Sequence, residues 1–412
     1  MTHTHSSLGP HLFFARSNGE CLIRALEARG IGYRYLSFGE ITRRRFAERT
    51  IATFQINGVT YYFDGAALRG SDLRHSVPGP LIDGSVEQFV RRKDLLNAFL
   101  RGCGFSVPEG AGYDREAQDG AEVFFGALSR HLPAGVCVKP AEGRKGRLVH
   151  LGIRDRVSFR KAFAAVAQDY NRVLIEEVVL GVVYRLLCVG GQVIAIRFGR
   201  PASVEGDGFH TIADLVTLKN AERKFGHKYA LVLGGRELDF LTHSGLDPNF
   251  VPEPGQRIFL SDLSNLHQGA DLIDATDAVH RSYIEMVERA LSHWPTMVLC
   301  GADVAIEDAS QPLSEANHHI LEFNCLPGFN GHHYPTQGQP RDVAGAIIDF
   351  LMGKRLLDAG ADSRDGGKGV RLQKQLGAIP VPGEIFQVLH YADRAIKGMI
   401  VCSADHIDSS PS

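Results

Sequence analysis

The sequence predicts a mixed α/β fold, and three observations support this prediction. From residue 86 to about 355, apolar runs of strand length alternate with amphipathic stretches of helix length. Nearer the N-terminus, "CLIRALEARGI" spaces its apolar residues three and four apart and includes a glycine near its end, which is typical of a helix. The segment "TIATFQINGVTYYFD" places Asn57 and Gly58 between two strand-like runs, which indicates a hairpin.

The chain is expected to divide into three parts. These are a small N-terminal α/β domain at 1–85, a main domain at 86–355, and a C-terminal appendage with a flexible linker and tail at 356–412. The main domain is expected to have a first part at about 86–182 and a second part at about 183–355. At its start, "VEQFVRRKDLLNAFLRGCGFSVPEG" predicts one amphipathic helix closed by glycine and proline.

Composition restricts the function classes. The formal net charge of -2 argues against generic attraction to nucleic acid or to an anionic membrane surface. The seven cysteines form no CxxC pair, which favours reduced, mostly packed thiols. The sequence shows neither a signal-peptide pattern nor an apolar stretch of membrane-spanning length, so we expect a cytoplasmic protein.

The segment "ILEFNC", residues 320–325, contains an acid and an amide within an apolar run. Because side chains alternate along a strand, Glu322 and Asn324 are expected on one face, and Leu321, Phe323 and Cys325 on the other. A buried carboxylate is unfavourable unless a cation or hydrogen-bond donors satisfy it. The pattern therefore indicates either a strand with one solvated face or a site for a hard metal ion.

A glycine loop follows a strand in "GVCVKPAEGRKGRLVHL". The strand is expected to end at Lys139, and the loop contains Gly143, Lys145 and Gly146. Glycines let backbone N–H groups approach a phosphate closely, but the loop lacks the Walker A pattern. An exposed hairpin is the alternative interpretation.

A second strand of interest lies in "VLIEEVVLGVVYRLLCVGGQVIAI". It is expected to end at Glu176 and Glu177, before an apolar linker that contains Val179. Backbone polar groups beside apolar side chains form a slot that suits adenine. A charged edge between two core strands explains the pattern equally well.

Taken in order and with their spacing, these motifs resemble the ATP-grasp ligases, in the branch that contains cyanophycin synthetase and bifunctional glutathione synthetase. The resemblance covers roughly residues 85–355. The motifs that carry it are "RRKDLLNAFL", Lys139-Pro140, Glu176-Glu177 with Gly181 and Tyr184-Arg185, "PASVEGDGFHTIADLV" with the following "KN", "IDATD", "CGADV", Glu322-Phe323-Asn324 with Pro327-Gly328, and "HHYPTQG" with "PR".

The resemblance implies an ATP-grasp fold preceded by a small pre-ATP-grasp domain, and it implies a set of site residues. The implied metal ligands, for two Mg²⁺ ions with Mn²⁺ as an alternative, are Asp303, Glu322 and Asn324. The implied ATP-binding residues are Lys93, Lys139, Gly143, Lys145, Gly146, Glu176, Glu177 and Val179. The implied catalytic residues are Arg185, Arg200 and Asn265. A lysine in "RRKD" is more commonly a solvated helix start, so Lys93 depends most on the resemblance.

The resemblance also implies an activity. ATP would phosphorylate a substrate carboxylate, and an amine would then attack the acyl phosphate to give an amide, ADP and phosphate. Small amino-acid or dipeptide substrates are expected, with neither nucleic acid nor membrane as a partner, and a homo-oligomer is left open. Three alternatives stay open: a ligase for a peptide or specialised metabolite, a nucleotide-binding protein without catalysis, and a histidine-based metal hydrolase.

The sequence departs from the family pattern in three places. Val183 stands where these ligases usually have an acid that holds the ribose. Gly199 stands at a usual arginine position, between Arg197 and Arg200, and we expect Arg200 to substitute for it. The loop "SNLHQGA" differs from the usual pattern, which suggests a different substrate. A zinc site that uses His318, His319, Cys325, His332 and His333 is a further alternative, although this spacing matches no standard ligand set.

Overall fold

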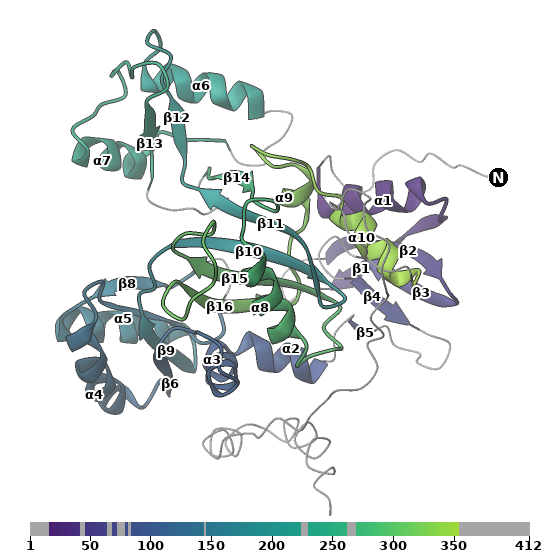
Figure 1. Ribbon diagram of the computed structural model, residues 1–412, viewed down its shortest axis with the longest axis horizontal. Coiled ribbons are helices and arrows are strands. Elements are labelled where there is room, and N and C mark those ends of the chain that lie inside the picture. The colour runs from purple at the N-terminus through teal and green to yellow at the C-terminus, as the bar shows by residue number, and fades with distance from the viewer. Residues whose placement is uncertain are drawn as a thin grey trace, which may run out of the picture.

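The structure is a computed structural model that describes residues 16–41, 46–63, 68–71, 79–80, 84–143, 146–223, 230–261 and 269–353. These residues form a mixed α/β fold with four sheets, whose strand pairs are antiparallel (Figure 1). None of the helices in these segments has the length and apolar content needed to cross a bilayer. The predicted linker and appendage at 356–412 lie outside the described residues.

The N-terminal sheet is a five-stranded meander. Its strands, in order, are β1 (Tyr33–Ile41), β2 (Phe46–Ile56), β3 (Val59–Phe63), β4 (Leu68–Ser71) and β5 (Gly79–Pro80). Helices α1 (Asn18–Ala28) and α10 (Val343–Leu351) share one apolar cluster with β2 and β3. Asn57 (φ 52°) and Gly58 (φ 77°) connect β2 to β3, which is the backbone conformation that a tight hairpin turn requires. The predicted helix and hairpin are therefore confirmed.

The central sheet has five strands and carries the candidate site. In spatial order they are β14 (Asp271–Asp274), β11 (Gln192–Arg200), β10 (Val182–Val189), β15 (Leu299–Ile306) and β16 (His318–Asn324). Helices α8 (Arg281–Leu291) and α9 (Asn330–His333) pack against this sheet. In Figure 1 it lies in the middle of the molecule, with the N-terminal sheet on one side and two lobes on the other.

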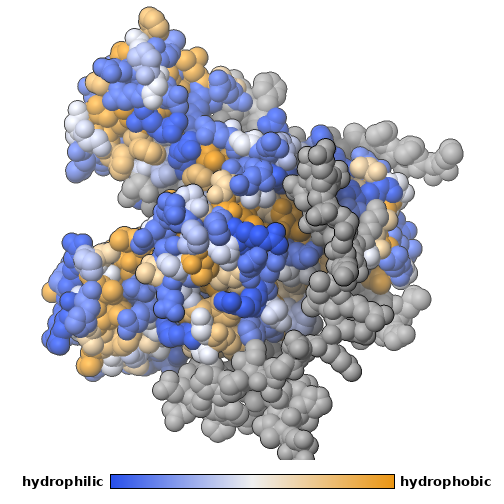
Figure 2. All heavy atoms as spheres, viewed as in Figure 1, coloured by the Kyte–Doolittle hydropathy of each residue, from blue (hydrophilic) through white to orange (hydrophobic). Residues whose placement is uncertain are grey.

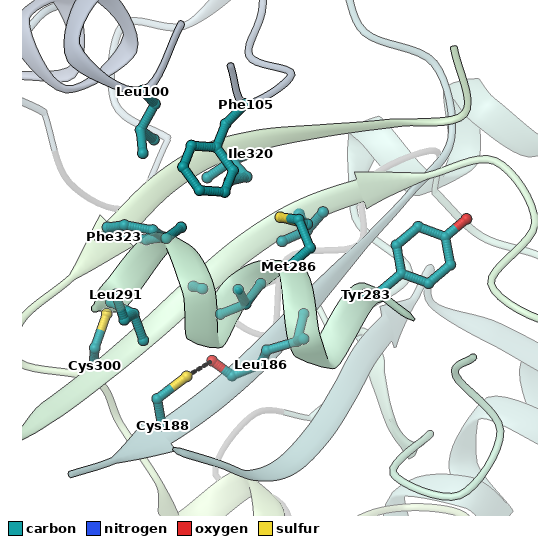
Figure 3. Packing of buried hydrophobic residues seen from close by; sticks show 14 of the residues in the cluster. Leu100, Phe105, Leu186, Cys188, Tyr283, Met286, Leu291, Cys300, Ile320 and Phe323 are labelled. Carbon is teal, nitrogen blue, oxygen red and sulfur yellow. Dashed lines mark hydrogen bonds between the residues drawn. The ribbon is translucent and has the colours of Figure 1, made fainter. Parts of the chain in front are cut away.

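The two faces of the central sheet are covered by different cores because its side chains alternate. Leu186 and Cys188 belong to the cluster shown in Figure 3, which includes Met286 of α8. Leu187 and Val189 instead belong to the cluster of α1 and α10. Arg185 shares a face with Leu187 by this alternation, and that face is the one on which the candidate site lies.

A four-stranded sheet forms one of the lobes. Its strands, in spatial order, are β6 (Gly110–Asp114), β9 (Arg172–Glu177), β7 (Val136–Pro140) and β8 (His150–Ile153). Helices α4 (Gln118–Leu128) and α5 (Arg156–Asp169) cover it around Phe125 and Phe159, and a short 3-10 helix, Ser129–His131, follows α4. The predicted strand end at Glu177 is confirmed, whereas β7 runs one residue past Lys139.

The predicted single helix at the start of the main domain is wrong. The chain instead forms α2 (Gly84–Arg91) and α3 (Lys93–Gly102), separated at Arg92, whose backbone is extended (φ -82°, ψ 92°). The break has a tertiary cause, since the Lys93 N–H donates to the Ala141 carbonyl at 3.1 Å. Asp94 also accepts hydrogen bonds from Arg92 and from Arg172 of β9. An amphipathic pattern alone carries no signal of these contacts.

The second lobe contains a two-stranded sheet and two helices. These elements are β12 (Ser203–Glu205), β13 (Arg257–Phe259), α6 (Ile212–Arg223) and α7 (Gly235–His243). Asn220, in the family motif, holds this lobe together by bonding both backbone groups of Leu231. The space-filling view is hollowed between this lobe and the lobe of α4 and α5 (Figure 2).

Candidate nucleotide and metal site

Four charged residues form a row across the central sheet. In the antiparallel register Arg197 on β11 lies opposite Arg185 on β10, Arg185 lies opposite Asp303 on β15, and Asp303 lies opposite Glu322 on β16. Residues directly opposite each other on neighbouring strands share a face. The row therefore brings two predicted metal ligands next to two arginines.

Glu322 and Asn324 both line the cleft, as the alternation predicted. Phe323 and Cys325 belong to the buried cluster on the opposite side, although they also border the cleft. Leu321 differs from the prediction. The register shifts between Asp303 and Val304, which makes a bulge at this point of the ladder. Leu321 consequently lines the same cavity as Glu322.

Both predicted carboxylate ligands are paired with basic side chains. Arg185 donates to both oxygens of Asp303, from Nε to Oδ1 at 2.7 Å and from Nη2 to Oδ2 at 2.5 Å. The Lys93 ammonium lies 3.1 Å from Glu322 Oε2. The start of α3 therefore reaches the central sheet, and Lys93 is not a solvated residue.

Burial and mutual charge separate the pKa values of the two acids. Burial raises the pKa of Asp303, opposed by Arg185 and supported by the neighbouring Glu322 carboxylate. Burial also acts to raise the pKa of Glu322, but the charge and hydrogen bond of Lys93 outweigh it and the pKa is lowered. A divalent cation bound at these acids would stabilise the charged form of both carboxylates.

Two cavities meet at these acids. One has a volume of about 370 Å³ and lies between β7, β9 and β16, and the other is a cleft of about 950 Å³ that extends from α2 to α9. Both are lined by Lys93, Asp303 and Glu322. Most of the predicted ATP-binding residues line the smaller cavity, namely Lys93, Lys139, Gly143, Gly146, Glu176, Glu177 and Val179. We call the smaller one the nucleotide cavity and the larger one the cleft.

The wall of the nucleotide cavity contains a buried ion pair. Lys139 and Glu176 lie on adjacent strands β7 and β9, and their charged groups are in direct contact. Burial acts to lower the pKa of Lys139, but the Glu176 charge outweighs it and the pKa is raised. Glu177 Oε1 accepts a hydrogen bond from the Glu109 N–H at 2.8 Å.

The glycine loop lies against Lys93. The Gly143 carbonyl accepts a hydrogen bond from Lys93 Nζ at 3.1 Å, and Gly146 has a positive φ of 68° that favours glycine. Gly143 and Gly146 line both cavities. Lys145 lies outside the described residues.

The predicted catalytic residues do not all lie together. Arg185 lines the cleft, and so does Arg197, which was the less favoured of the two candidate arginines. Arg200 is absent from the described lining of both cavities, and its Nη1 donates to Gln337 Oε1 at 2.8 Å. Residues 197 and 199 share a strand face. Arg197 therefore lies on the same face as Gly199, which stands at the usual arginine position of the family. Asn265 lies outside the described residues.

The histidines of the alternative zinc site have other surroundings. His318 Nδ1 lies 2.7 Å from the Ser314 carbonyl, and His333 Nε2 accepts from the Ala344 N–H at 2.9 Å. Burial lowers the pKa of both rings. Within the part of the chain that the structure describes, no group of three or more His, Cys, Asp or Glu residues could hold a metal ion.

Arg147, whose charge the sequence places in the glycine loop, lines both cavities. Sequence reasoning missed the apolar residues that follow this loop, since Val149 and Leu151 line the nucleotide cavity. Val149 and Leu151 are exposed to solvent although they are apolar. The alternation in "RLVHLGI" was a usable signal, because two exposed apolar side chains on one face suit a flat aromatic base.

Other family motifs have structural roles. Asp274, in "IDATD", accepts hydrogen bonds from Arg341, in the "PR" motif, and from Thr276. The bond from Arg341 joins the segment after α9 to the end of β14. Val183 lines both cavities, so an apolar side chain stands where the family pattern has an acid.

Comparisons with known proteins agree with this architecture. The glutathione biosynthesis bifunctional protein of Clostridium perfringens is 31% identical over 272 residues, which are 64% of this chain and 34% of that protein. Cyanophycin synthetase of Trichormus variabilis is 34% identical over 222 residues, which are 53% of this chain and 24% of that protein. This chain thus spans about a third or less of the length of these relatives. No protein-family model matches the chain.

A solved structure shows the same fold. The crystal structure of a bifunctional glutathione synthetase from Pasteurella multocida superposes with a TM-score of 0.57 and 22% identity, covering 81% of this chain and 43% of that one. The resemblance predicted from the motifs is therefore confirmed: the chain is similar to the ATP-grasp ligases and has the ATP-grasp fold.

Proposed function

We propose that this chain is an ATP-dependent carboxylate–amine ligase that forms an amide bond between amino-acid-like substrates. One observation carries the proposal. The nucleotide cavity and the cleft adjoin each other, and Lys93, Asp303 and Glu322 are among the residues that line both. A phosphoryl group bound at these residues can therefore face a nucleotide on one side and a substrate on the other.

The nucleotide cavity suits ATP in charge and shape. Lys139 and Lys93 both line this cavity beside the glycine loop and would bind phosphates, together with the backbone N–H groups near Gly143 and Gly146. Val149, Leu151 and Val179 would contact the adenine. Glu176 keeps Lys139 charged in its buried position, because a buried lysine without a partner tends to lose its proton.

The donor set at the shared wall fits magnesium. Two carboxylates and one amide oxygen are hard ligands, and Asp303 and Glu322 lie opposite each other on adjacent strands. Asn324 Oδ1 accepts one hydrogen bond, from the Leu326 N–H at 3.0 Å, and keeps a second lone pair for a cation. When bound, magnesium would neutralise phosphate charge and orient the γ-phosphoryl group.

In this reaction the protein positions the substrates, and no side chain acts as a nucleophile. A carboxylate oxygen of the donor attacks the γ-phosphorus, the bond from that phosphorus to the β–γ bridging oxygen breaks, and ADP leaves. The amine attacks the acyl phosphate carbon, the carbon–oxygen bond to phosphate breaks, and the nitrogen loses a proton. Arg185 and Lys93 would stabilise the charge on the phosphoryl group.

The substrates are proposed as amino acids or dipeptides, with a peptide or specialised metabolite as the alternative. A nucleotide-binding protein without catalysis is the rival from another class, and the Arg185–Asp303 and Lys93–Glu322 pairs favour it because they occupy the metal ligands. Once a cation binds Asp303 and Glu322, Arg185 and Lys93 become available to bind phosphate groups.

Hydroxylamine trapping tests the proposal. The protein is incubated with ATP, Mg²⁺, hydroxylamine and each member of a panel of amino acids and dipeptides, and hydroxamate and ADP are measured. We expect equal amounts of both with at least one carboxylate donor, since hydroxylamine intercepts an acyl phosphate. ADP release without hydroxamate would indicate simple hydrolysis, and neither product with any donor would favour the binding-protein rival.

A further inference from the structure

One wall of the cleft is held from outside the central sheet. The segment that leads into the short helix α9 contributes Gly328 to the cleft lining, and α9 itself contributes Asn330 and Gly331. A Cβ at Gly331 would lie 3.3 Å from Arg197 Nε and 2.8 Å from a methyl carbon of Leu272, so the backbone of α9 packs directly on the central sheet. A small displacement of α9 would therefore change the shape of the cleft.

The side chain of Asn18, the first residue of α1, holds the start of α9. Its Oδ1 accepts hydrogen bonds from the Phe329 N–H at 3.0 Å and from the Asn330 N–H at 2.8 Å. The first N–H groups of a helix have no partner within that helix, and the N-cap residue Phe329 provides no side-chain cap. Asn18 therefore caps α9 from a different helix. Because both donors are backbone N–H groups, the atom that faces them is the oxygen, which fixes the orientation of the Asn18 amide.

Two further contacts join this segment to the N-terminal part of the chain. Asn330 Nδ2 donates to the Arg16 carbonyl at 2.9 Å. Phe329 is only 1% exposed, and its ring centroid lies 6.3 Å from that of Phe63 on β3. The start of α1 is itself fixed, since the Ser17 side chain caps it. α9 is thus attached to α1 and to the N-terminal sheet as well as to the central sheet.

The position of α9 bears on the substrate side of the site. Gly328, Asn330 and Gly331 line the cleft and are absent from the described lining of the nucleotide cavity. Arg197, against which α9 packs, lies directly opposite Arg185 in the strand register. A donor whose carboxylate reaches a phosphoryl group beside Arg185 is therefore close to α9, whereas the adenine end of the nucleotide is not.

We propose that Asn18 is a positioning residue for the donor substrate: it fixes α9, and α9 shapes the wall of the cleft on which the donor lies. Asn18 is itself absent from the described lining of both cavities, so it acts through α9 and not by contact with the substrate. The inference rests on the proposed ligase function and adds to it a role for α1 in substrate binding.

Four variants of the full chain separate this role from ordinary stability. Asn18→Ala removes the acceptor, whereas Asn18→Asp keeps an oxygen at the same position. Arg29→Gln is the stability control, because Arg29 at the end of α1 binds both oxygens of Asp349 on α10, at 2.9 and 2.7 Å, and so fastens α1 at a point other than α9. Arg281→Gln is the surface control, since Arg281 is an exposed arginine on α8 that pairs with Glu285 on the same helix.

The first test measures amide hydrogen exchange in overlapping peptides that contain Phe329 and Asn330. Asn18→Ala should speed the exchange of these two amides by at least about tenfold, since an amide that has lost its hydrogen bond no longer needs local opening to exchange. Asn18→Asp, Arg29→Gln and Arg281→Gln should exchange here as the unaltered chain does. Unchanged exchange in Asn18→Ala would show that Asn18 does not hold α9, and would overturn the proposal.

The second test measures ADP release with a donor that gives hydroxamate. Asn18→Ala should raise the donor KM by at least about tenfold while the ATP KM stays nearly unchanged, because only the cleft wall moves. Asn18→Asp should recover most of the loss. Arg29→Gln should lower the unfolding temperature but leave the donor KM unchanged, and Arg281→Gln should change neither.

Three kinetic results would overturn the inference while leaving the ligase function intact. One is an unchanged donor KM in Asn18→Ala. Another is an equal rise of the donor KM in Arg29→Gln, which would reduce the effect to a loss of stability. The third is Asn18→Asp as impaired as Asn18→Ala, which would mean that the amide nitrogen contacts the substrate. Absence of ADP release by the unaltered chain with every donor would instead refute the ligase function, and the substrate role of Asn18 with it.

Discussion

Arg185 and Asp303 lie opposite each other on β10 and β15, and the guanidinium holds both oxygens of the carboxylate. The same carboxylate is a proposed metal ligand, so a cation and Arg185 compete for it. Without a metal ion, the ion pair with Asp303 holds Arg185 next to the position where the phosphoryl group would lie. Binding of a metal ion would release it toward the phosphates.

Arg185→Gln tests this competition. Removing one positive charge beside Asp303 and Glu322 should strengthen binding of Mn²⁺ to the chain without nucleotide by about tenfold, which corresponds to about 1.4 kcal/mol. Ligation should nevertheless fall steeply, because the phosphoryl group loses a cation. Mn²⁺ binding is measured by calorimetry, with Arg281→Gln as the control. Unchanged or weaker Mn²⁺ binding would place the metal elsewhere.

Glu322→Gln separates the metal role from folding. The amide keeps the size of the side chain but removes the charge opposite Asp303, so we expect a folded protein whose ADP release falls by at least about a hundredfold, or about 2.7 kcal/mol. Far-UV circular dichroism and ADP release are measured together, with Glu285→Gln on α8 as a surface control. Normal ligation at low Mg²⁺ concentration by Glu322→Gln would refute the assignment.

Val183 predicts weak recognition of the ribose. An acid at this position would add one or two charge-assisted hydrogen bonds worth about 1.5–3 kcal/mol each. Since valine provides none, ATP and 2′-deoxy-ATP should have similar KM values, and Val183→Glu should make the chain prefer ATP. A strong preference for ATP in the unaltered chain would mean that another acid, such as Glu177, holds the ribose.

Asp94 predicts a pH-dependent contribution to stability. Its carboxylate is buried and binds Arg92 and Arg172, and the two arginines outweigh burial and lower its pKa. Asp94→Asn should reduce the free energy of unfolding at neutral pH by about 2 kcal/mol, because the buried carboxylate loses its charge-assisted hydrogen bonds. The loss is moderate, since both arginines are partly exposed and keep Glu142 and Asp114 as second partners.

The sign of the pH effect follows from the lowered pKa. A group whose folded pKa lies below its unfolded value, about 3.9 for aspartate, stabilises the fold above that value and loses the effect as pH falls through the folded pKa. The difference between the unaltered chain and Asp94→Asn, measured by urea unfolding, should therefore be constant near neutral pH and vanish in strong acid. A constant difference down to the lowest pH would contradict the ion-pair explanation.

Several features of the site could be read from short stretches of sequence. The shared face of Glu322 and Asn324, the position of Lys139 near a strand end and the Asn57–Gly58 hairpin all follow from local rules about alternation and turn conformation. The order of the motifs was enough to predict the ATP-grasp fold.

Other features depend on contacts between distant residues. The break between α2 and α3 follows from Asp94 binding Arg172, and the presence of Arg197 instead of Arg200 in the cleft lining follows from which face of β11 borders the cleft. The bulge that turns Leu321 toward the nucleotide cavity is likewise a property of the β15–β16 pairing.

The sequence by itself therefore determined the residue types of the site and, where a strand is regular, the faces on which they lie, because those depend on neighbours along the chain. Only the tertiary structure decided which charges meet. Lys93 reaches Glu322 although the two are far apart in sequence, and Arg197 stands beside Arg185 with no ion pair to an acid in the described part of the chain. Strand register and the docking of α3 set these contacts, and both result from packing over the whole domain, which no local pattern encodes.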